Sequence, residues 1–375
     1  MHKKPKKVHI FHISESGGHN KAAQNLKEAL HYKNPQIDVL NLNGLGYFYP
    51  RGEKIVNSIY ITIIKHFPHI WGKAYDRRKV VKALTPYRKI INRFTFSRLN
   101  KLITRYPPDC FVATQAFPCG LIADFKEKMG LKCPLVAIIT DYHPHRFWIH
   151  PFVDRYIVAC QEAKNVLISE GIDAEKVKIL GIPISVKFLT SYPKEQISRE
   201  LGFVADLDSV LIMGGGLGIG PIKSIARKLD VLEDNFQIIV VCGRNKKLHN
   251  WFLKKREKFK KPLFVFGYTE NIHKVMDFSD IIITKGGGIT ISEALAKGLC
   301  IIVTYSIPGQ EERNVSYLSK KQAIIKSDHA KDIGEIINSL LQNKKRMYSL
   351  RERAKENSYI DSSLRIVDLI LELIS

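Results

Sequence analysis

The histidine at position 19 is the residue whose type and place in the chain best suit acid–base chemistry. It closes a short polar turn with two glycines, SESGGH at residues 14–19, directly after the apolar stretch of residues 8–13. An imidazole titrates at about pH 6.5, so at neutral pH it can accept a proton from a hydroxyl group. A lone histidine in a turn is more often structural or solvated. Its position after an expected strand favours a general base.

Glycine-rich segments follow two further expected strands. They have the sequences GGGLG at residues 214–218 and GGG at residues 286–288, and each precedes an expected helix. Backbone N–H groups at a glycine-rich helix start suit a diphosphate. Neither segment is a G-x-G-x-x-G, and the sequence contains no G-x-x-x-x-G-K-[ST] loop, which disfavours the usual dinucleotide and ATP sites. A single glycine cluster is more often a tight turn, but two in one half of the chain strengthen the diphosphate interpretation.

Two groupings of residues could suggest a metal ion. Asp206 and Asp208 form a D-x-D motif, but they precede an expected strand and therefore fall at the wrong end of a parallel sheet, so we interpret them as a polar turn. The second grouping is a loop that contains Asp141, His143, His145 and His150. The H-x-H spacing of His143 and His145 on an irregular loop is a weak signal for a metal site. We therefore expect no metal site and no bound cofactor.

These residues are positioned by short apolar strands and amphipathic helices in a pattern that occurs twice. The expected strands are residues 8–13, 37–42, 110–114, 135–140, 155–158, 209–213, 237–242, 263–266, 280–284 and 300–304. The expected helices are residues 20–31, 221–233, 246–258, 270–277, 290–297, 343–358 and 363–374. Alternating strands and helices form parallel βαβ units, so the sequence predicts an α/β protein with two doubly wound, Rossmann-like domains. We expect their strand ends to point into a central cleft.

The turn-rich Gly-Ile-Pro stretch at residues 181–183 precedes the second series of strands. We therefore expect an N-terminal domain over residues 1–183, a C-terminal domain over 184–360, and a final helix over 361–375 that could pack back on the N-terminal domain. Residues 43–105 contain few strand signals and form an expected insertion in the first domain.

The chain is strongly basic, with 59 Lys and Arg against 36 Asp and Glu and a net charge of +23. Residues 51–105 hold 14 basic and two acidic residues, a net +12, around apolar residues at helical spacing. Such a segment suits an anionic membrane surface. It would also suit a packed helix with a solvated face. Nucleic acid is disfavoured because the chain has no helix-turn-helix, RNP-type or zinc-finger pattern.

Other features bound the location of the protein. No apolar run approaches the length of about 18–20 residues that a spanning helix needs, and the basic N-terminus lacks the apolar core of a signal peptide. The six cysteines form no C-x-x-C pair, which favours a reducing compartment. We expect a cytoplasmic protein, peripheral on the inner face of the cell membrane.

Eight segments in order along the chain resemble a known family. They are SGGHNKAA (16–23), TDYHPHRFWIHPFVDRYIV (140–158), GIPI (181–184), MGGGLG (213–218), VCGRNKKL (241–248), FGYT (266–269), TKGGGITISEAL (284–295) and PGQEERN (308–314). In these motifs the chain resembles the glycosyltransferase family 28 lineage of monogalactosyldiacylglycerol synthases and bacterial diacylglycerol glucosyltransferases. The resemblance implies a GT-B fold and an inverting transfer of glucose or galactose from a UDP-sugar to the sn-3 hydroxyl of 1,2-diacylglycerol.

The resemblance also implies roles for single residues. His19 matches the family's motif histidine and would be the catalytic base. In GT-B enzymes helix N-termini and basic or hydroxyl groups take the place of a metal at the diphosphate, and Glu293 would hold the ribose hydroxyls. The full set of implied donor residues is Gly215, Gly216, Arg244, Phe266, Gly267, Tyr268, Gly287, Gly288, Thr290, Glu293, Gln310, Glu311 and Asn314. The family usually has proline where this chain has Gly286, and we expect the glycine to loosen that loop.

The acceptor and the membrane would be contacted from the first domain. The implied residues are His145, Phe147, Trp148, Ile63, Ile64, Phe67, Arg77, Arg78, Lys79 and Lys82. Two alternatives stay open: transfer to another lipid-linked acceptor, such as a peptidoglycan precursor, and a non-catalytic membrane or nucleic-acid binder on the same scaffold. The presence of His19, Glu293, Gln310 and Glu311 speaks against a non-catalytic protein.

The basic segment generates a testable prediction about membranes. Charge reversal of four basic residues should weaken sedimentation with phosphatidylglycerol vesicles, because attraction between exposed charges is screened over about 8 Å at physiological salt; the residues are Arg77, Arg78, Lys79 and Lys82. Serine substitutions of three apolar residues should weaken binding even at low salt; these are Ile63, Ile64 and Phe67.

UDP binding is the control for these variants, because it should survive both sets of substitutions. Unchanged sedimentation of both variants would make residues 51–105 an ordinary packed segment.

Overall fold

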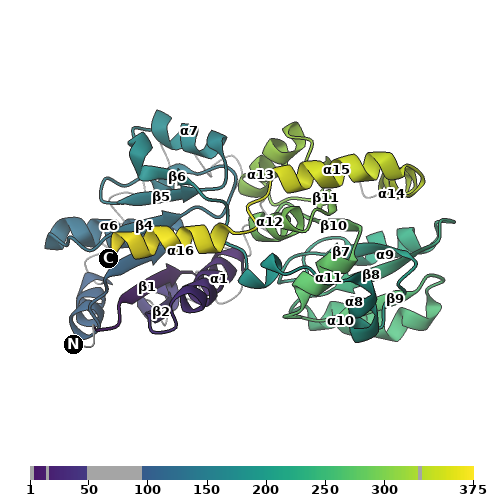
Figure 1. The fold of residues 1–375 in the computed structure, drawn as a ribbon, viewed down its shortest axis with the longest axis horizontal. Helices are drawn as coiled ribbons and strands as arrows, with labels where there is room; N and C mark the ends of the chain where they lie inside the picture. The colour runs from purple at the N-terminus through teal and green to yellow at the C-terminus, as the bar shows by residue number, and fades with distance from the viewer. Residues whose placement is uncertain (1–3, 14–16, 49–94, 328–331) are drawn as a thin grey trace. The chain divides into compact units, whose positions relative to one another are not determined.

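The computed structural model describes residues 4–13, 17–48, 95–327 and 332–375, and Figure 1 shows its ribbon. The chain forms two compact units. The first contains the chain up to Val186 together with Ile307–Gln310 and Asp361–Ser375, and the second contains Lys187–Ser306 and Glu311–Ile360. Most of the expected insertion over 43–105 lies outside the described residues. So do seven of the residues expected to contact the membrane: Ile63, Ile64, Phe67, Arg77, Arg78, Lys79 and Lys82.

The first unit is built on a parallel sheet of six strands. These are β1 (Lys7–His12), β2 (Asp38–Asn43), β3 (Cys110–Ala113), β4 (Leu135–Ile138), β5 (Arg155–Val158) and β6 (Val177–Ile179). Their order across the sheet is β2-β1-β3-β4-β5-β6, and every neighbouring pair is parallel. The residues of β3 and β4 are all buried, as expected for central strands that helices cover on both faces.

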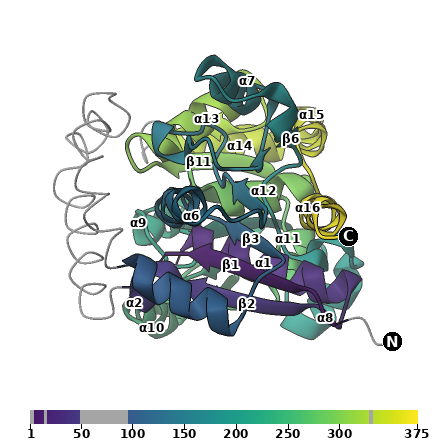
Figure 2. The same ribbon diagram turned by 90° about the vertical axis from the view of Figure 1, so that its left-hand side faces the viewer.

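Helices complete the first unit. They are α1 (Gly18–Lys33), α2 (Gly44–Phe48), α6 (Ala116–Met129), α7 (Gln161–Ser169) and α16 (Ser362–Leu373), with 3₁₀ turns η1 (Arg146–Trp148) and η2 (Ala174–Lys176). The last helix of the chain, α16, lies beside α1 on the first sheet, as Figure 1 and Figure 2 both show. Its Ile366 and Ile370 share a buried cluster with Leu26 and Leu30 of α1.

The second unit repeats this design. Its strands are β7 (Asp208–Met213), β8 (Phe236–Val241), β9 (Leu263–Phe266), β10 (Ile281–Lys285), β11 (Cys300–Tyr305) and β12 (Ile325–Lys326). They are all parallel in the order β12-β11-β10-β7-β8-β9. Counted from β7, this is the Rossmann order 3-2-1-4-5-6, in which the chain changes direction across the sheet between β7 and β10. The predicted pair of Rossmann-like domains is therefore confirmed.

The helices of the second unit follow its strands. They are α8 (Lys194–Leu201), α9 (Ile222–Asp230), α10 (Lys246–Lys255), α11 (Ile272–Phe278), α12 (Gly288–Ala296), α13 (Gln310–Lys320), α14 (Ile333–Gln342) and α15 (Lys344–Glu356), with η3 (Val186–Leu189) at the boundary and η4 (Arg256–Lys258) after α10. Ile225 and Leu229 of α9 pack on the buried residues of β8, together with Ile337 of α14. Across the described ranges, no helix is long and apolar enough to cross a bilayer.

Candidate functional site

The strand order of each unit determines where a site can form. In the first sheet β1 and β3 are neighbours, and the chain leaves β1 toward β2 on one side. In the second sheet β7 and β10 are neighbours in the same way. Ligands of open parallel sheets bind outside the carboxyl ends of such strand pairs, because loops from the two strands diverge there. His19 follows β1, and the two predicted glycine-rich segments follow β7 and β10.

His19 lies in the first turn of α1, one residue beyond its start at Gly18. We expected His19 in the loop before a helix over residues 20–31. That expectation was wrong, because the helix begins two residues earlier, at Gly18. The hydroxyl of Thr140 lies 2.9 Å from Nδ1 of His19. The Thr114 hydroxyl donates a 2.9 Å hydrogen bond to the His19 carbonyl. Thr114 and Thr140 follow β3 and β4, so three successive positions along the sheet edge hold this histidine.

The environment of His19 keeps its imidazole neutral. Burial lowers the pKa of His19 from its ordinary 6.5 to about 4, and repulsion from His12 adds to this, while a hydrogen bond to the backbone of Thr114 opposes it. A neutral imidazole can accept a proton at pH 7. In the tautomer whose Nδ1–H donates to Thr140, the lone pair is on Nε2. The site therefore has the chemistry that a general base requires.

Thr140 and Thr114 were missed as functional residues in the sequence. Thr140 is the first residue of the TDYH motif, and both threonines stand just past the carboxyl end of an apolar strand. That position was the available signal. A hydroxyl can donate to a ring nitrogen or accept from it, so Thr140 fixes the orientation of the His19 ring.

The loop with the expected acceptor residues is more buried than the sequence suggested. Trp148 is 2% exposed, so its side chain is an apolar part of the protein interior. The His145 ring packs against the Phe147 ring at a centroid distance of 5.7 Å. Nε2 of His150 donates to the Phe147 carbonyl over 3.1 Å, with the ring in the tautomer that carries this proton. Among the side chains that the structure describes, no group of three or more metal-ligating residues converges.

The loop after β7 closes on itself. Gly218 N–H donates to the Gly215 carbonyl at 3.0 Å, and Ile219 N–H donates to the Gly214 carbonyl at 3.0 Å. The following helix α9 begins only at Ile222. The loop therefore folds into a turn before the helix. The helix starts within one residue of the expected position 221, so the glycines precede it without forming its first turn.

This loop instead packs backbone to backbone on the loop after β8. A Cβ added to Gly218 would lie 2.2 Å from the Cys242 carbonyl oxygen, and one added to Gly243 would lie 2.5 Å from that of Gly216. Both glycines also have φ near +60°, which side chains rarely allow. Arg244 N–H donates to the Gly216 carbonyl at 2.9 Å. The glycines are thus needed for close packing.

The loop after β10 does open its helix. Gly287 is the N-cap and Gly288 the first residue of α12. The first turns of this helix carry two expected donor residues, Thr290 and Glu293, and both are buried. An N-terminal helix turn with its unpaired backbone donors attracts anions. Of the two predicted glycine sites, this one has the predicted geometry.

The two loops come together around a residue that the sequence analysis did not assign, Lys285. A Cβ added to Gly215 would lie 3.3 Å from Lys285 Cε and 3.9 Å from the Thr290 hydroxyl. A Cβ added to Gly287 would lie 2.8 Å from Lys285 Nζ. Lys285 also forms an ion pair with Glu311. It is the last residue of β10, and a cation at a strand end directly before a glycine run was the signal for it.

Gly286 is tightly packed. A Cβ there would lie 2.8 Å from the Ser306 hydroxyl and 2.9 Å from the Glu311 carbonyl oxygen. Its N–H donates to the Tyr305 carbonyl at 2.9 Å. The expectation of a looser loop is therefore wrong: the missing side chain lets the start of α13 approach.

Other expected donor residues take different places. Asn314 is fully buried and donates to the Gly286 carbonyl at 3.1 Å, so it positions the loop. The Phe266 carbonyl accepts from Cys242 N–H at 2.8 Å. Gly267 links Phe266 to Tyr268, which is 51% exposed and carries the Arg244 guanidinium 5.2 Å from its ring centroid. Gln310, assigned to the first unit, donates to the Asp141 carboxylate.

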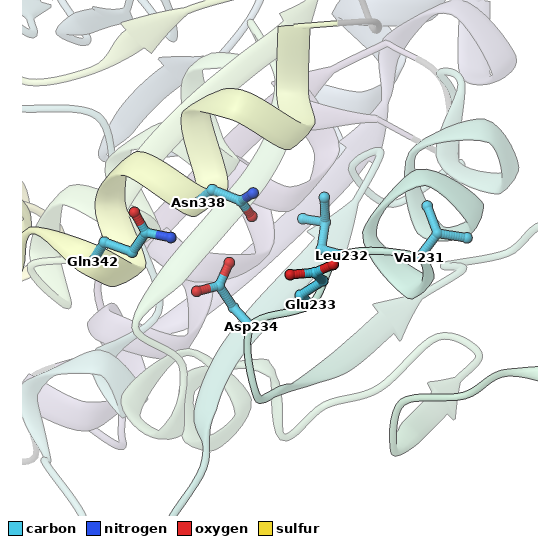
Figure 3. A pocket seen from close by; sticks show the side chains of 6 residues that line it. All are labelled: Val231, Leu232, Glu233, Asp234, Asn338 and Gln342. Carbon is cyan, nitrogen blue, oxygen red and sulfur yellow. The ribbon is translucent and has the colours of Figure 1, made fainter.

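A cavity of about 420 Å³ elsewhere in the second unit is a poor candidate for this chemistry (Figure 3). Its lining residues are Val231, Leu232, Glu233, Asp234, Asn338 and Gln342. Glu233 and Asp234 lie in the loop that leads into β8, at the amino ends of the strands. Two carboxylates would repel a phosphate, so the glycine-rich loops after β7 and β10 are the stronger candidate.

Two doubly wound, all-parallel sheets in one chain are the architecture of the GT-B class of fold. Solved structures agree over 98% of this chain: MurG of Acinetobacter baumannii has a TM-score of 0.62 at 13% identity and is covered over its full length. The MnaA–UDP structure from S. aureus has a TM-score of 0.64 at 15% identity, over 97% of its length.

Family models match both halves of the chain. Residues 19–184 match the monogalactosyldiacylglycerol (MGDG) synthase family, and residues 209–368 match the glycosyltransferase family 28 C-terminal domain. The processive diacylglycerol beta-glucosyltransferase of Bacillus cytotoxicus is 31% identical over 99% of this chain and 95% of its own. The protein of the same name from Bacillus pumilus is 32% identical over 80% of this chain and 76% of its own. The chain belongs to glycosyltransferase family 28, in the branch with these enzymes.

The first prediction from this site concerns His19. Replacement of His19 by Ala should lower kcat by ~10²–10⁴-fold, the usual loss for a general base, with little change in the affinity for UDP. Turnover of product and calorimetric UDP binding measure the two effects. His31→Ala is the matched control, because His31 is exposed on the same helix. Near-normal turnover of His19→Ala would remove His19 from the base role.

The second prediction concerns pH. Because burial holds the pKa of His19 at about 4, kcat/KM should stay level as pH falls through 6.5 and should decline only toward pH 4. Between pH 6.5 and pH 4, His19 is protonated in the unfolded chain and neutral in the folded protein. The free energy of unfolding therefore falls as the pH falls through this range. A pH–rate profile paired with thermal melts separates the effects. An acid limb centred at pH 6.5, without loss of folding, would contradict the lowered pKa.

Proposed function

We propose that this protein transfers glucose from UDP-glucose to the sn-3 hydroxyl of 1,2-diacylglycerol and inverts the configuration at the anomeric carbon. The observation that carries the proposal is the near full-length likeness to relatives named processive diacylglycerol beta-glucosyltransferases. A neutral, oriented histidine in the first unit and a helix start for an anion in the second unit support it.

In the proposed reaction, Nε2 of His19 takes the proton from the acceptor hydroxyl. The hydroxyl oxygen attacks the anomeric carbon of the sugar, the bond from that carbon to the diphosphate oxygen breaks, and UDP leaves with the electron pair. A single displacement converts the α-linked donor into a β-linked product, in keeping with the word beta in the relatives' names. Thr140 holds the ring through Nδ1, and Nε2 acts as the base in the tautomer whose Nδ1–H donates to the Thr140 hydroxyl.

The second unit is the proposed donor site. The helix start at Gly287–Gly288 and the Thr290 hydroxyl would stabilise the charge that develops on the leaving diphosphate. The Glu293 carboxylate would accept hydrogen bonds from the ribose hydroxyls, since a carboxylate can accept two O–H donors. Tyr268 and Arg244 would border the uracil. Gln310 and Glu311 would contact the hexose.

A galactosyl product is the second candidate, because the first half of the chain matches the monogalactosyldiacylglycerol synthase family. Glucose and galactose differ only in the direction of one hydroxyl. We favour glucose because the near full-length relatives are named glucosyltransferases. We also propose a peripheral location at the inner face of the membrane, with anionic lipids as partners of the basic residues 51–105.

A lipid product assay tests this function. The protein is incubated with liposomes of 1,2-sn-diacylglycerol and either UDP-glucose or UDP-galactose, and mass spectrometry then counts the hexoses added. Anomeric proton couplings by NMR give the configuration, and the 2,3-sn enantiomer is the acceptor control. We expect β-glucosyl diacylglycerol. A product with galactose alone would select the second candidate, and no lipid product with either donor would overturn the proposal.

The donor site also predicts activity in the presence of EDTA. The proposed diphosphate contacts are a helix start and side chains of the protein, so chelation of divalent ions should leave the initial rate within about two-fold. Initial rates with and without EDTA measure this. Full loss on chelation, restored by Mg²⁺ or Mn²⁺ but not by Na⁺, would contradict it.

A further inference from the structure

Lys285 stands at the meeting point of the two glycine-rich loops. Its Cε lies against Gly215 and its Nζ against Gly287, as the distances to their added Cβ positions show. These loops leave the neighbouring strands β7 and β10, where the sheet offers its binding position. Because Gly215 and Gly287 have no side chains, the end of the Lys285 side chain fits between the two loops.

The Lys285 ammonium is mostly buried and has a counter-ion. It pairs with the Glu311 carboxylate, and the two side chains are only 16% and 9% exposed. Removal of one partner from such a pair leaves a charge with little water to stabilise it, so Lys285 needs an anion close by in every state. Glu311 provides that anion in the structure described here.

The backbone of Glu311 is held independently of the ion pair. It is fixed at the loop because Gly286 lets its carbonyl approach, and the Asn314 amide ties α13 to the Gly286 carbonyl. These contacts do not involve the Glu311 carboxylate, so they do not depend on its pairing with Lys285. A diphosphate that reaches Lys285 brings two negative charges to the same ammonium and repels the carboxylate.

We propose that Lys285 binds the donor diphosphate and that Glu311 is its resting counter-ion, which the diphosphate displaces and so releases to accept hydrogen bonds from the hexose. The proposal rests on the proposed function, since it takes the donor to be a UDP-sugar. The sugar contact then forms only when a diphosphate is present. A sugar without the diphosphate meets a carboxylate that is still held by Lys285.

Binding of UDP and of uridine tests the two halves of the proposal. Lys285→Gln should weaken UDP binding by ~10- to 100-fold, the usual effect of a lost charged hydrogen bond, and should leave uridine binding within about two-fold. Glu311→Gln should bind UDP at least as tightly as the wild type, yet show a lower kcat/KM with UDP-glucose. The displacement model thus predicts opposite changes in UDP affinity for the two variants. If the ion pair were purely structural, both variants would lose UDP affinity together with thermal stability.

Two further variants keep the test decisive. Lys274→Gln is the matched control, because Lys274 is 18% exposed in an ion pair with Glu200 on other helices of the same unit; it should leave both affinities unchanged. The double variant Lys285→Gln/Glu311→Gln leaves no unpaired charge, so it should fold even where Lys285→Gln does not. It should keep the weak UDP binding.

The outcomes distinguish the two proposals. A wild-type protein that binds UDP and makes glycolipid, with normal UDP affinity in the double variant, would overturn the role of Lys285 alone. Parallel loss of UDP affinity in both single variants would overturn the displacement. A wild-type protein that binds no UDP would overturn the donor assignment as well.

Discussion

The carboxyl edge of a parallel sheet is the constraint on which the rest of this molecule depends. Every described strand of both sheets is parallel to its neighbours, so each sheet sends all its outgoing loops to one edge. Backbone dipoles and unsatisfied helix starts gather at that edge, and the apolar strands behind it exclude water. At this edge the first unit holds the His19 imidazole neutral. At the corresponding edge the second unit places the Lys285 side chain between two glycine-rich loops. The same geometry thus serves two kinds of chemistry.

Close backbone packing determines how the second unit uses this edge. A Cβ added to Gly218, Gly243 or Gly286 would lie 2.2, 2.5 or 2.9 Å from a backbone carbonyl oxygen of another segment, closer than van der Waals contact allows. A side chain at any of them would push the neighbouring backbone away. At Gly286 the carbonyl is that of Glu311, so a substitution there would shift Glu311 relative to Lys285 without touching either side chain of the ion pair.

The sequence predicted what depends on local pattern. Apolar strands such as β5 and β9 were placed at their observed ends, because each is a short apolar run that turn residues bound. Helix α6 was missed, because nearly all its faces are buried and Pro118 and Gly120 interrupt any amphipathic stripe. The contact of Lys285 with Glu311 joins residues 26 positions apart, and Thr140 reaches His19 across 121. Spacing along the chain carries no information about such contacts. The burial of Trp148 could not be predicted either, because it also depends on residues that are distant in the sequence.

The helix α16 has a consequence for how the chain acquires its structure. Its apolar face supplies Ile366, Val367 and Ile370 to the core of the first unit, but it follows the whole second unit in the sequence and so leaves the ribosome after that unit. The N-terminal sheet must therefore wait, with part of its apolar surface uncovered, while the whole second unit is synthesised. Domains that fold during synthesis usually begin with the N-terminal one. Here the second unit can be complete first, and α16 then closes the core of the first unit.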